Sequence, residues 1–312
     1  MEPGKILVRN IPGYIFNALV GLAAKRDRST EAEARQAITA WVSPALIEDE
    51  RGTRSKEVAQ RLTLLLEQVN AAKPAGKHRP SHVAQAIGEE RAQHVEDWFL
   101  GKQEPTFSQL ASIAQVYGVR SPWLQHGDGH IYPVNYERLP DSPAQAVQWL
   151  SSWPNEDTDD DTLEHLHLIR ENSEGGAFYL VKQSKAGRYL IYRTPYKISE
   201  EIGAGGEGAL KHLFLSLEVL YKKYSSGDYR ITSYLMRPDD VKTLINGNTN
   251  PAMLLRDRDE CIWWEDIWDP EQYPTRQYWE GWKSLCERID RAISSTPYLN
   301  ELRAKNRTGE VQ

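Results

Sequence analysis

The pattern of apolar and polar residues changes its period at Pro12. Residues 6–11 alternate as a short strand does when one of its faces is buried. Residues 14–25 and 30–42 then carry apolar side chains at helical spacing, with the polar run 27–29 between them. A lone strand leaves its edge groups unpaired and one apolar face uncovered, so we expect this segment to pair with a second copy of itself.

Four runs within this segment match a known DNA-binding family. They are residues 8–12 at the strand end, 18–19 and 23–24 in the first helix, and 28–33 opening the second. The segment resembles the ribbon-helix-helix (Arc/MetJ-like) fold, and within it antitoxins of the VapB/FitA type. The resemblance implies a dimer in which two antiparallel strands lie in the major groove of DNA above four helices. The residues expected to be buried beneath the ribbon are Ile15, Leu19, Leu22, Ile38 and Trp41.

The strand supplies the first candidate contacts with DNA. Alternation places Lys5 and Arg9 on the same face. We expect Arg9 to read a guanine edge through two hydrogen bonds, with Lys5 beside it. Asn10 is an alternative base reader, because a family resemblance does not fix the parity of the last strand residues.

The start of the second helix supplies further candidate contacts. Ser29 and Thr30 lie there, and Thr30 and Glu33 have the spacing of a capping box. Free backbone N–H groups at such a helix start can hold a phosphate. The alternative is that Ser29 and Thr30 only cap the helix.

Residues 51–131 form a second module with a different organisation. We expect Ser43 and Pro44 to end the preceding helix and residues 48–53 to be a polar linker. Residues 55–70 have a helical period, and residues 80–129 follow a motif that occurs in bacterial repressors. The matching positions are 83–88, Val95, Trp98, 101–102, Pro105, 110–111, 113–114, 117–119, 123–124 and Gly127. This segment resembles the helix-turn-helix domain of the lambda-repressor/XRE class.

The helix-turn-helix resemblance assigns roles to individual residues. It implies a first helix over residues 81–87, a turn at Gly88 and a recognition helix over residues 91–100 in the major groove. Ser81 and Lys102 are expected to contact phosphates. The residues expected to meet base edges are Arg91, Ala92, Gln93, His94 and Asp97.

The recognition helix is more acidic than is usual in this class. Glu89, Glu90, Glu96 and Asp97 lie in or beside it, which weakens attraction to phosphates. The alternative interpretation is therefore that this motif is a structural or dimerising module. The ribbon and the basic segment 54–79 would then bind the DNA.

The distribution of charge bears on how DNA is approached. The whole chain has a formal net charge of −6, yet residues 51–79 hold seven Lys and Arg against two Asp and Glu. Residues 132–312 hold 22 against 29. Because phosphate contact is local and charges are screened beyond about 8 Å at physiological salt, we expect the acidic C-terminal half to face away from DNA.

Residues 132–312 match no family that we know, and their pattern predicts an α+β domain. Helices are expected at residues 141–150, 162–170, 209–224, 239–245 and 277–294. Strands are expected at residues 178–183, 188–192, 229–236 and 261–265, the first two joined as a hairpin by residues 184–187. The expected fold class is thus multidomain: a β-α-α ribbon-helix-helix module over 1–50, an all-α helix-turn-helix domain over 51–131, and an α+β domain over 132–312.

The C-terminal half contains several runs that resemble metal or phosphate sites, but each signal is weak. The acidic run 153–161 is more typical of a solvated linker than of a Mg²⁺ site. The glycine-rich run 203–208 lacks the Gly-Lys-Ser/Thr ending of a phosphate loop, so a flexible loop is favoured. On the expected helix, His165 and His167 fall on opposite faces and are poor joint ligands. We expect no metal, no cofactor and no catalytic centre.

Other residue types in this half fit ordinary structural roles. Cys261 and Cys286 lack metal-ligand spacing and fit a reducing compartment. Five tryptophans cluster near the end, and such aromatics more often form a core or dimer face than a ligand cage. They are Trp263, Trp264, Trp268, Trp279 and Trp282.

Together these features predict a homodimeric, sequence-specific transcriptional regulator, a repressor acting on promoters that include its own. Its two reading modules would engage operator segments about 34 Å apart. The expected partners are double-stranded DNA, a second copy of the chain, and a protein or small molecule at the C-terminal domain. No apolar run approaches the roughly 18 residues of a membrane span, so we expect a cytoplasmic, nucleoid-associated protein.

Two alternatives come from other functional classes. The VapB/FitA resemblance favours an antitoxin whose C-terminal part neutralises a toxin, although such antitoxins usually have only a short tail. In the other alternative, the C-terminal domain is an enzyme that the DNA-binding half anchors.

Overall fold

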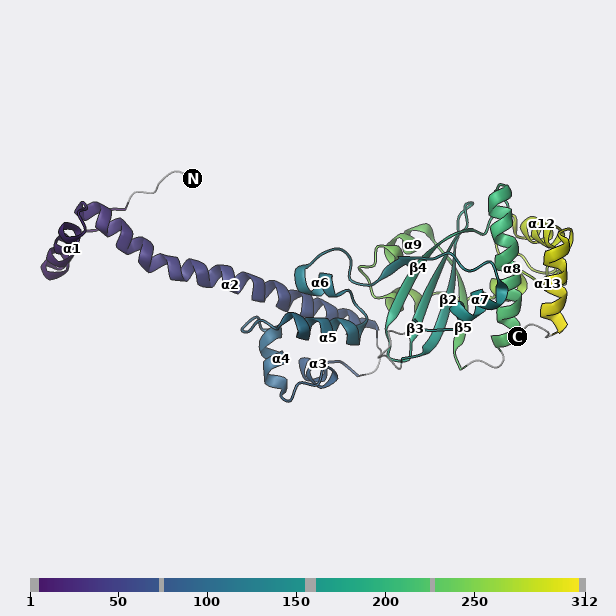
Figure 1. The fold of residues 1–312 in the computed structure, drawn as a ribbon, viewed down its shortest axis with the longest axis horizontal. Coiled ribbons are helices and arrows are strands. Elements are labelled where there is room, and N and C mark those ends of the chain that lie inside the picture. Colours follow the sequence, from purple (N-terminus) through teal and green to yellow (C-terminus); the bar gives the residue numbers. More distant parts are fainter. Residues whose placement is uncertain (1–5, 73–75, 155–160, 225–227, 309–312) are drawn as a thin grey trace.

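The computed structural model describes residues 6–72, 76–154, 161–224 and 228–308, and leaves the side chains of residues 43–53 undescribed. The fold combines helices with one mixed five-stranded sheet. One long helix projects from a compact body, and the first helix folds back against its far end as a hairpin (Figure 1). No described helix is long and apolar enough to cross a membrane.

The N-terminal arm, residues 6–42, does not contain the strand predicted for residues 6–11. Residues 6–12 have no regular secondary structure in the single chain, and Asn10 has a φ of +63°, which interrupts an extended run. Helix α1 (Gly13–Lys25) follows. Ile6 and Leu7 are 74% and 76% exposed. The prediction of a strand is therefore wrong for one chain, which supplies no neighbouring strand to pair with.

The helices of the arm do not form a core of their own. Among its described side chains only Ala23 and Glu33 are buried. The residues expected beneath a ribbon are exposed, apart from the half-buried Leu19: Ile15, Leu22, Ile38 and Trp41. The arm thus presents apolar side chains that its own chain leaves uncovered.

Helix α2 (Thr30–Ala72) runs for 43 residues without a break. The predictions that Ser43 and Pro44 end a helix and that residues 48–53 form a linker are therefore wrong. Proline removes one hydrogen bond, but residues 45–72 are rich in Leu, Ala, Glu and Arg, which favour helix. The boundary expected between residues 50 and 51 lies inside this helix.

The second half of α2 packs with four short helices into a helical module. They are α3 (Pro80–Ala86), α4 (Ala92–Phe99), α5 (Phe107–Tyr117) and α6 (Ser121–His126). Gly88, with a φ of +76°, makes the turn between α3 and α4. The module's core includes Val58, Leu62, Leu65, Val83, Val95, Trp98, Leu110, Ile113 and Leu124. The helices expected at 81–87 and 91–100 are present as α3 and α4, with bounds within one residue of those expected. The helix expected at 55–70 ends near its predicted end but starts at Thr30, because it is the second half of α2.

The C-terminal half is built on a sheet with the strand order β1-β4-β3-β2-β5. The strands are β1 (Val134–Tyr136), β2 (Leu163–Glu171), β3 (Ala177–Ser184), β4 (Tyr189–Lys197) and β5 (Arg230–Met236). β3 is antiparallel to both neighbours, whereas β1–β4 and β2–β5 are parallel pairs. The helices are α7 (Pro143–Leu150), α8 (Ala204–Tyr224), α9 (Pro238–Ile245), α10 (Pro251–Leu255), α11 (Trp263–Asp266), α12 (Trp282–Ser294) and α13 (Pro297–Thr308).

Several expectations for this half are wrong. Residues 162–170, predicted as a helix, form strand β2, and the strand predicted for residues 261–265 is replaced by the short helix α11. Most of the glycine-rich run expected as a loop, from Ala204 onward, already belongs to α8. The sequence also did not predict β1, α10 or α13. Helix α13 is held to α8 by Arg303, whose Nε lies 3.0 Å from Glu218 Oε2, a contact between residues far apart in sequence.

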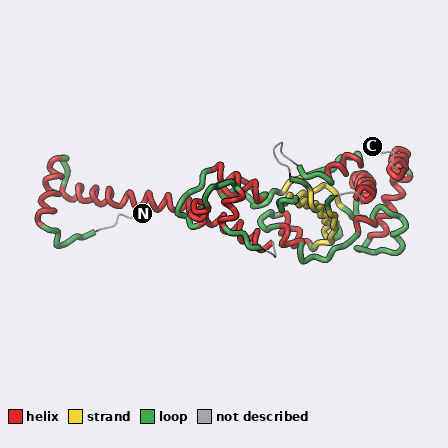
Figure 2. The backbone as a smooth tube through the Cα atoms, turned by 90° about the horizontal axis from the view of Figure 1, so that it is seen from below, coloured by secondary structure: helices red, strands yellow, loops and turns green. Residues whose placement is uncertain are grey.

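The two faces of the sheet are covered by different elements. Helices α8, α12 and α13 lie on one side, and α9 and the helical module lie on the other (Figure 1). Figure 2 shows the strands enclosed between helices and loops. Four of the five tryptophans are at most 7% exposed in the α8-side core, and Trp268 packs against it, so they form core in this structure.

The second face of the sheet shares one core with the helical module. Ile169 of β2 and Ile191 of β4 belong to the same buried cluster as Trp98 of α4 and Leu124 of α6. The predicted modules 51–131 and 132–312 are therefore packed together through a common apolar core. A substitution at their contact can therefore alter the packing of both modules.

Candidate nucleic-acid interface and adjoining pocket

Helix α4 turns one apolar face inward and leaves a polar face in solvent. Val95 and Trp98 are buried, which fixes the rotation of this short helix against the module's core. Arg91 at its N-cap, and Gln93 and His94 in its first turn, are exposed. The structure thus brings three of the five predicted base readers together on one accessible surface.

The remaining residues predicted at this surface are partly engaged with one another. Asp97, which is partly buried, accepts a hydrogen bond from Gln93 Nε2 at 3.3 Å, and Lys102 Nζ lies 3.8 Å from the same oxygen. Ala92 is also partly buried, whereas Ser81 is exposed in the first turn of α3. We conclude that Gln93 and Asp97 hold each other in position in the free protein.

The acidic residues around α4 differ in whether their carboxylates contact other side chains. Glu89 accepts a hydrogen bond from Gln109 Nε2 at 2.7 Å, and its other oxygen lies 3.8 Å from His94 Nδ1. Glu90 and Glu96 are exposed. Part of the acidity noted in the sequence therefore serves to join α4 to α5, since Gln109 lies in the first turn of α5.

Part of the basic segment 54–79 holds the module together. Arg54 Nε lies 2.5 Å from Glu104 Oε1, and Arg61 Nε donates to the Leu124 carbonyl at 3.0 Å. Burial lowers the pKa of Arg61. These two arginines tie α2 to other parts of the module, so they are not simply exposed charges.

The N-terminal candidates lie on the arm. Lys5 falls outside the described residues, while Arg9 and Asn10 are exposed on the irregular segment before α1. Ser29 caps α2, because its Oγ accepts a hydrogen bond from the Ala32 N–H at 3.1 Å. Thr30 is the first residue of α2 and is partly exposed.

The capping box predicted between Thr30 and Glu33 is wrong. The carboxylate of Glu33 is buried and lies 2.5 Å from Arg26 and 3.6 Å from Arg28. An ion pair with two arginines competes successfully with a neutral contact to the backbone. The ion pairs of Glu33 thus stabilise the turn between α1 and α2.

The two groups of candidates lie far apart along α2. Gly101, directly after α4, packs against Lys56 of α2. From Thr30 to Lys56 a helix rises roughly 39 Å at 1.5 Å per residue. The arm and α4 are therefore separated by about the length of that part of α2, and the structure does not bring their candidates together.

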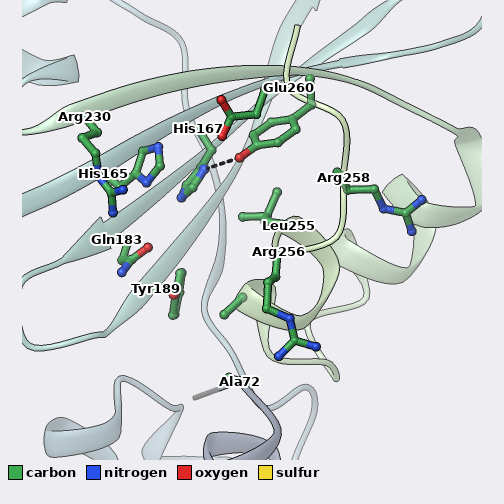
Figure 3. A pocket seen from close by; sticks show the side chains of 12 residues that line it. Ala72, His165, His167, Gln183, Tyr189, Arg230, Leu255, Arg256, Arg258 and Glu260 are labelled. Atoms are coloured by element: carbon green, nitrogen blue, oxygen red, sulfur yellow. Dashed lines mark hydrogen bonds between the residues drawn. The ribbon is translucent and has the colours of Figure 1, made fainter. Parts of the chain in front are cut away.

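A cavity of about 370 Å³ lies where the sheet meets the end of α2. Strands β2, β3, β4 and β5, helix α10 and the segment after it provide its walls, with Ala72 of α2 at one side (Figure 3). The residues used below are His165, His167, Gln183, Tyr189, Arg230, Leu255, Arg256, Arg258 and Glu260. We refer to this cavity as the His-Arg pocket.

The two histidines belong to a hydrogen-bonded row on the sheet. His165 Nε2 and Thr232 Oγ1 are 2.7 Å apart, and His167 Nδ1 lies 3.2 Å from the Tyr234 hydroxyl, the contact drawn dashed in Figure 3. Both histidines point to the same face because β2 is a strand. The expectation that they lie on opposite faces of a helix is therefore wrong.

Burial keeps this row neutral near pH 7. It lowers the pKa of His165 to about 4, with Arg230 acting in the same direction. Burial also lowers the pKa of His167 well below its usual value, and the nearby Gln183 acts the other way. Burial raises the pKa of Tyr189 to about 12. The charges at the pocket therefore come from its arginines and from Glu260.

Sequence reasoning missed this pocket because it assigned residues 162–170 to a helix. The residues His165, His167 and Ile169 alternate with Leu166 and Leu168, which is also the period of a strand. That alternation was the available signal. Arg230 and Arg256 carry no motif that marks them, and only the fold brings them to the histidines.

Among the described residues, no group of His, Cys, Asp and Glu side chains has a geometry that could hold a metal ion. Comparisons with models of protein families, with curated proteins and with solved structures found no match for this chain.

Proposed function

We propose that this protein is a homodimeric, sequence-specific DNA-binding regulator of transcription. The observation that carries the proposal is the polar face of α4. Arg91, Gln93 and His94 stand exposed at the start of a short helix that follows a tight turn, while Val95 and Trp98 fix its rotation. Side chains at the start of a helix fixed in this way suit the major groove.

The arm supports a second reading module and a dimer. Its apolar residues, among them Ile15, Ile38 and Trp41, are exposed in the single chain. An apolar surface of this kind is typical of a segment that folds with a partner. A second copy would cover these residues and would give residues 6–11 a strand to pair with, so that Arg9 or Asn10 reaches base edges.

The length of α2 suits binding by both modules to one DNA. Thr30 and Lys56 are roughly 39 Å apart along the helix, which is close to the 34 Å that separates successive major-groove faces of a duplex. Linking two modules raises the effective concentration of each at the DNA. Weak attraction by the acidic α4 is then sufficient, because the arm contributes to the same binding event.

In this mechanism the two modules contribute different contacts. Gln93 suits adenine, Asp97 accepts from a cytosine amino group, and Arg9 suits guanine. Ser29, Thr30, Ser81 and Lys102 contact phosphates, which set position but not sequence. Occupation of a promoter by the dimer excludes polymerase and represses transcription.

Selection from genomic DNA tests the proposal. Full-length protein is mixed with fragmented DNA from its own source at physiological salt, and the retained fragments are sequenced. We expect discrete sites, and we expect Arg9→Ala and Gln93→Ala to lose different parts of the recognised sequence. Arg193→Ala and Gln115→Ala, which change exposed residues outside both surfaces, serve as controls.

Two outcomes of this selection contradict the proposal in different degrees. Retention without discrete sites rejects sequence-specific regulation. If Gln93→Ala selects the same sites as the unmodified protein while Arg9→Ala selects none, α4 does not read DNA and the helical module serves as a scaffold.

A further inference from the structure

The His-Arg pocket has the size and lining of a site for a small organic molecule. Its volume of about 370 Å³ lies within the range typical of ligand pockets. Leu255, Ala252 and Ala72 give it apolar surface, and Gln183 and Tyr189 add polar groups. Such a mixture of apolar walls and a few polar groups binds a ligand and fixes its orientation.

One arginine at the pocket offers a contact for an anion, while Glu260 carries the opposite charge. Three arginines and one glutamate line it. Arg258 lies 2.7 Å from Asp240, and Arg256 lies 3.3 Å from Asp257. Arg230, by contrast, has no ion pair with any residue that the structure describes, and its side chain lies beside His165 (Figure 3). It is therefore available to a carboxylate or another anionic group.

The histidines beside Arg230 favour a ligand that also carries a hydrogen-bonding group. His167 is only 4% exposed, and within the described residues its Nε2 makes no hydrogen bond of normal length, although the Gln183 side chain lies close enough to act on its pKa. Its Nδ1 is already engaged by Tyr234. A buried polar nitrogen without a partner is unfavourable, and a polar group of a ligand would relieve this.

The shape of this wall favours a flat ligand. The rings of His165 and His167 stack with their centroids 3.9 Å apart, and they share one face of the sheet. Tyr189 and Leu255 line the same cavity. A planar ring packs well against imidazole, phenol and leucine side chains.

We propose that the His-Arg pocket binds a small aromatic carboxylate, with its carboxylate against Arg230 and a polar ring substituent toward His167 Nε2. The ligand would lie between the sheet, α10 and the last turn of α2. Arg256 Nη1 donates to the Ala71 carbonyl at 3.1 Å, so one lining residue already joins the pocket to α2. Ligand binding would therefore act on the helix that carries the arm at its other end.

Binding itself is tested on the full-length protein without DNA. The probes are salicylate, 4-hydroxybenzoate and indole-3-carboxylate at millimolar concentration, observed by saturation-transfer NMR and isothermal titration. We expect at least one probe to bind, and its neutral amide analogue to bind at least about tenfold more weakly. If none of the three binds, the proposal is overturned.

Variants locate the binding. Arg230→Gln removes the proposed carboxylate partner and should weaken binding at least about tenfold. His167→Phe keeps a flat ring but removes the nitrogen, and should weaken binding several-fold. Arg193→Gln changes an exposed arginine on β4 that does not line the cavity, and should bind as the unmodified protein does. Binding that survives Arg230→Gln unchanged overturns the proposal.

Inorganic phosphate separates an aromatic site from a general anion site. We expect phosphate to compete poorly, because it lacks the flat apolar body. If phosphate displaces the bound probe at equal concentration, the aromatic part of the proposal is overturned.

A consequence for DNA rests on the proposed function and is measured separately. If discrete DNA sites are found, a bound probe should change affinity for them, and Arg230→Gln should abolish the change. If the protein does not bind DNA, the ligand-binding experiment still gives its own result. The proposed function and the proposed ligand site can therefore fail independently.

Discussion

The imidazole rings of His165 and His167 stack with their centroids 3.9 Å apart on one face of β2. Each ring has one nitrogen joined to β5, at Thr232 and at Tyr234. Two protonated imidazoles at this distance would repel each other in a poorly solvated place. The neutral state of both rings is therefore part of the folded structure.

We expect acid to destabilise the fold through this pair. Above pH 6.5 neither the folded nor the unfolded chain protonates these rings, so they add no pH dependence. As the pH falls from 6.5 to about 4, His165 takes up a proton in the unfolded chain but largely not in the folded one, and the free energy of unfolding drops by about 3 kcal/mol. His167, whose pKa is lowered as well, acts in the same direction.

Urea unfolding at several pH values measures this effect. His165→Gln with His167→Gln should show a shallower loss of stability between pH 6.5 and 4 than the unmodified chain. His126→Gln, at an exposed position in α6, should follow the unmodified chain. Equal slopes in all three proteins would mean that the pair is protonated in the fold.

Local sequence signals, together with the family resemblance, were enough to predict helices α3 and α4. Gly88 and the apolar residues Val95 and Trp98 mark a turn and a buried helix face within about twenty residues of each other. Turn chemistry and helical period depend on near neighbours, so the sequence shows them directly. The exposed polar face of α4 follows from the same pattern.

Long-range pairing explains what could not be predicted. Residues 162–170 are apolar enough to form either a helix or a strand. They form a strand because they pair with β3 and β5. The His-Arg pocket depends on that choice, because a strand puts His165 and His167 on one face. Arg230 and Arg256 reach it only through the sheet order and the position of α10.

The close packing of the helical module on the sheet gives a test with two glycines. Gly118 and Gly88 both have positive φ, at +64° and +76°. A side-chain carbon on Gly118 would lie 2.8 Å from Arg188 Cβ, while one on Gly88 would meet nothing within 4 Å. We expect Gly88→Ala to cost about 1 kcal/mol of unfolding free energy, from backbone strain alone. Gly118→Ala should cost about 1–3 kcal/mol more, because it also overpacks the contact.

Urea unfolding of the two glycine variants measures the difference. Equal losses in both would show that Arg188 moves aside and that the contact between module and sheet is loose. A larger loss for Gly118→Ala would show that the contact is tight, and the matched φ values exclude backbone strain as its cause.

The exposed apolar arm predicts association of two chains. Ile38 of α2 is 43% exposed in the single chain, and a dimer would bury it. We expect Ile38→Glu to raise the dimer dissociation constant at least about tenfold, because a charge would enter an apolar interface. Sedimentation velocity over a range of concentrations measures this.

Leu64→Glu is the matched control for the arm. Leu64 lies on the same helix and is 42% exposed, but it belongs to the helical module. This variant should dimerise as the unmodified protein does. If the unmodified protein is a monomer throughout, the arm does not pair with a second copy, and the antitoxin alternative, in which a different protein is bound, gains support.

The exposed acid on α4 tests whether this helix approaches DNA. Glu96 is exposed beside the proposed base readers, so it would face phosphates in a complex. We expect Glu96→Gln to bind selected DNA sites about two- to tenfold more tightly, because one repulsive charge is lost, and we expect the gain to shrink as salt is raised. Titration of labelled DNA at several salt concentrations measures both effects. Glu280→Gln, an exposed change in the C-terminal half, should have no effect. If Glu96→Gln behaves in the same way as Glu280→Gln, α4 stays away from the DNA, and the arm alone would have to read it.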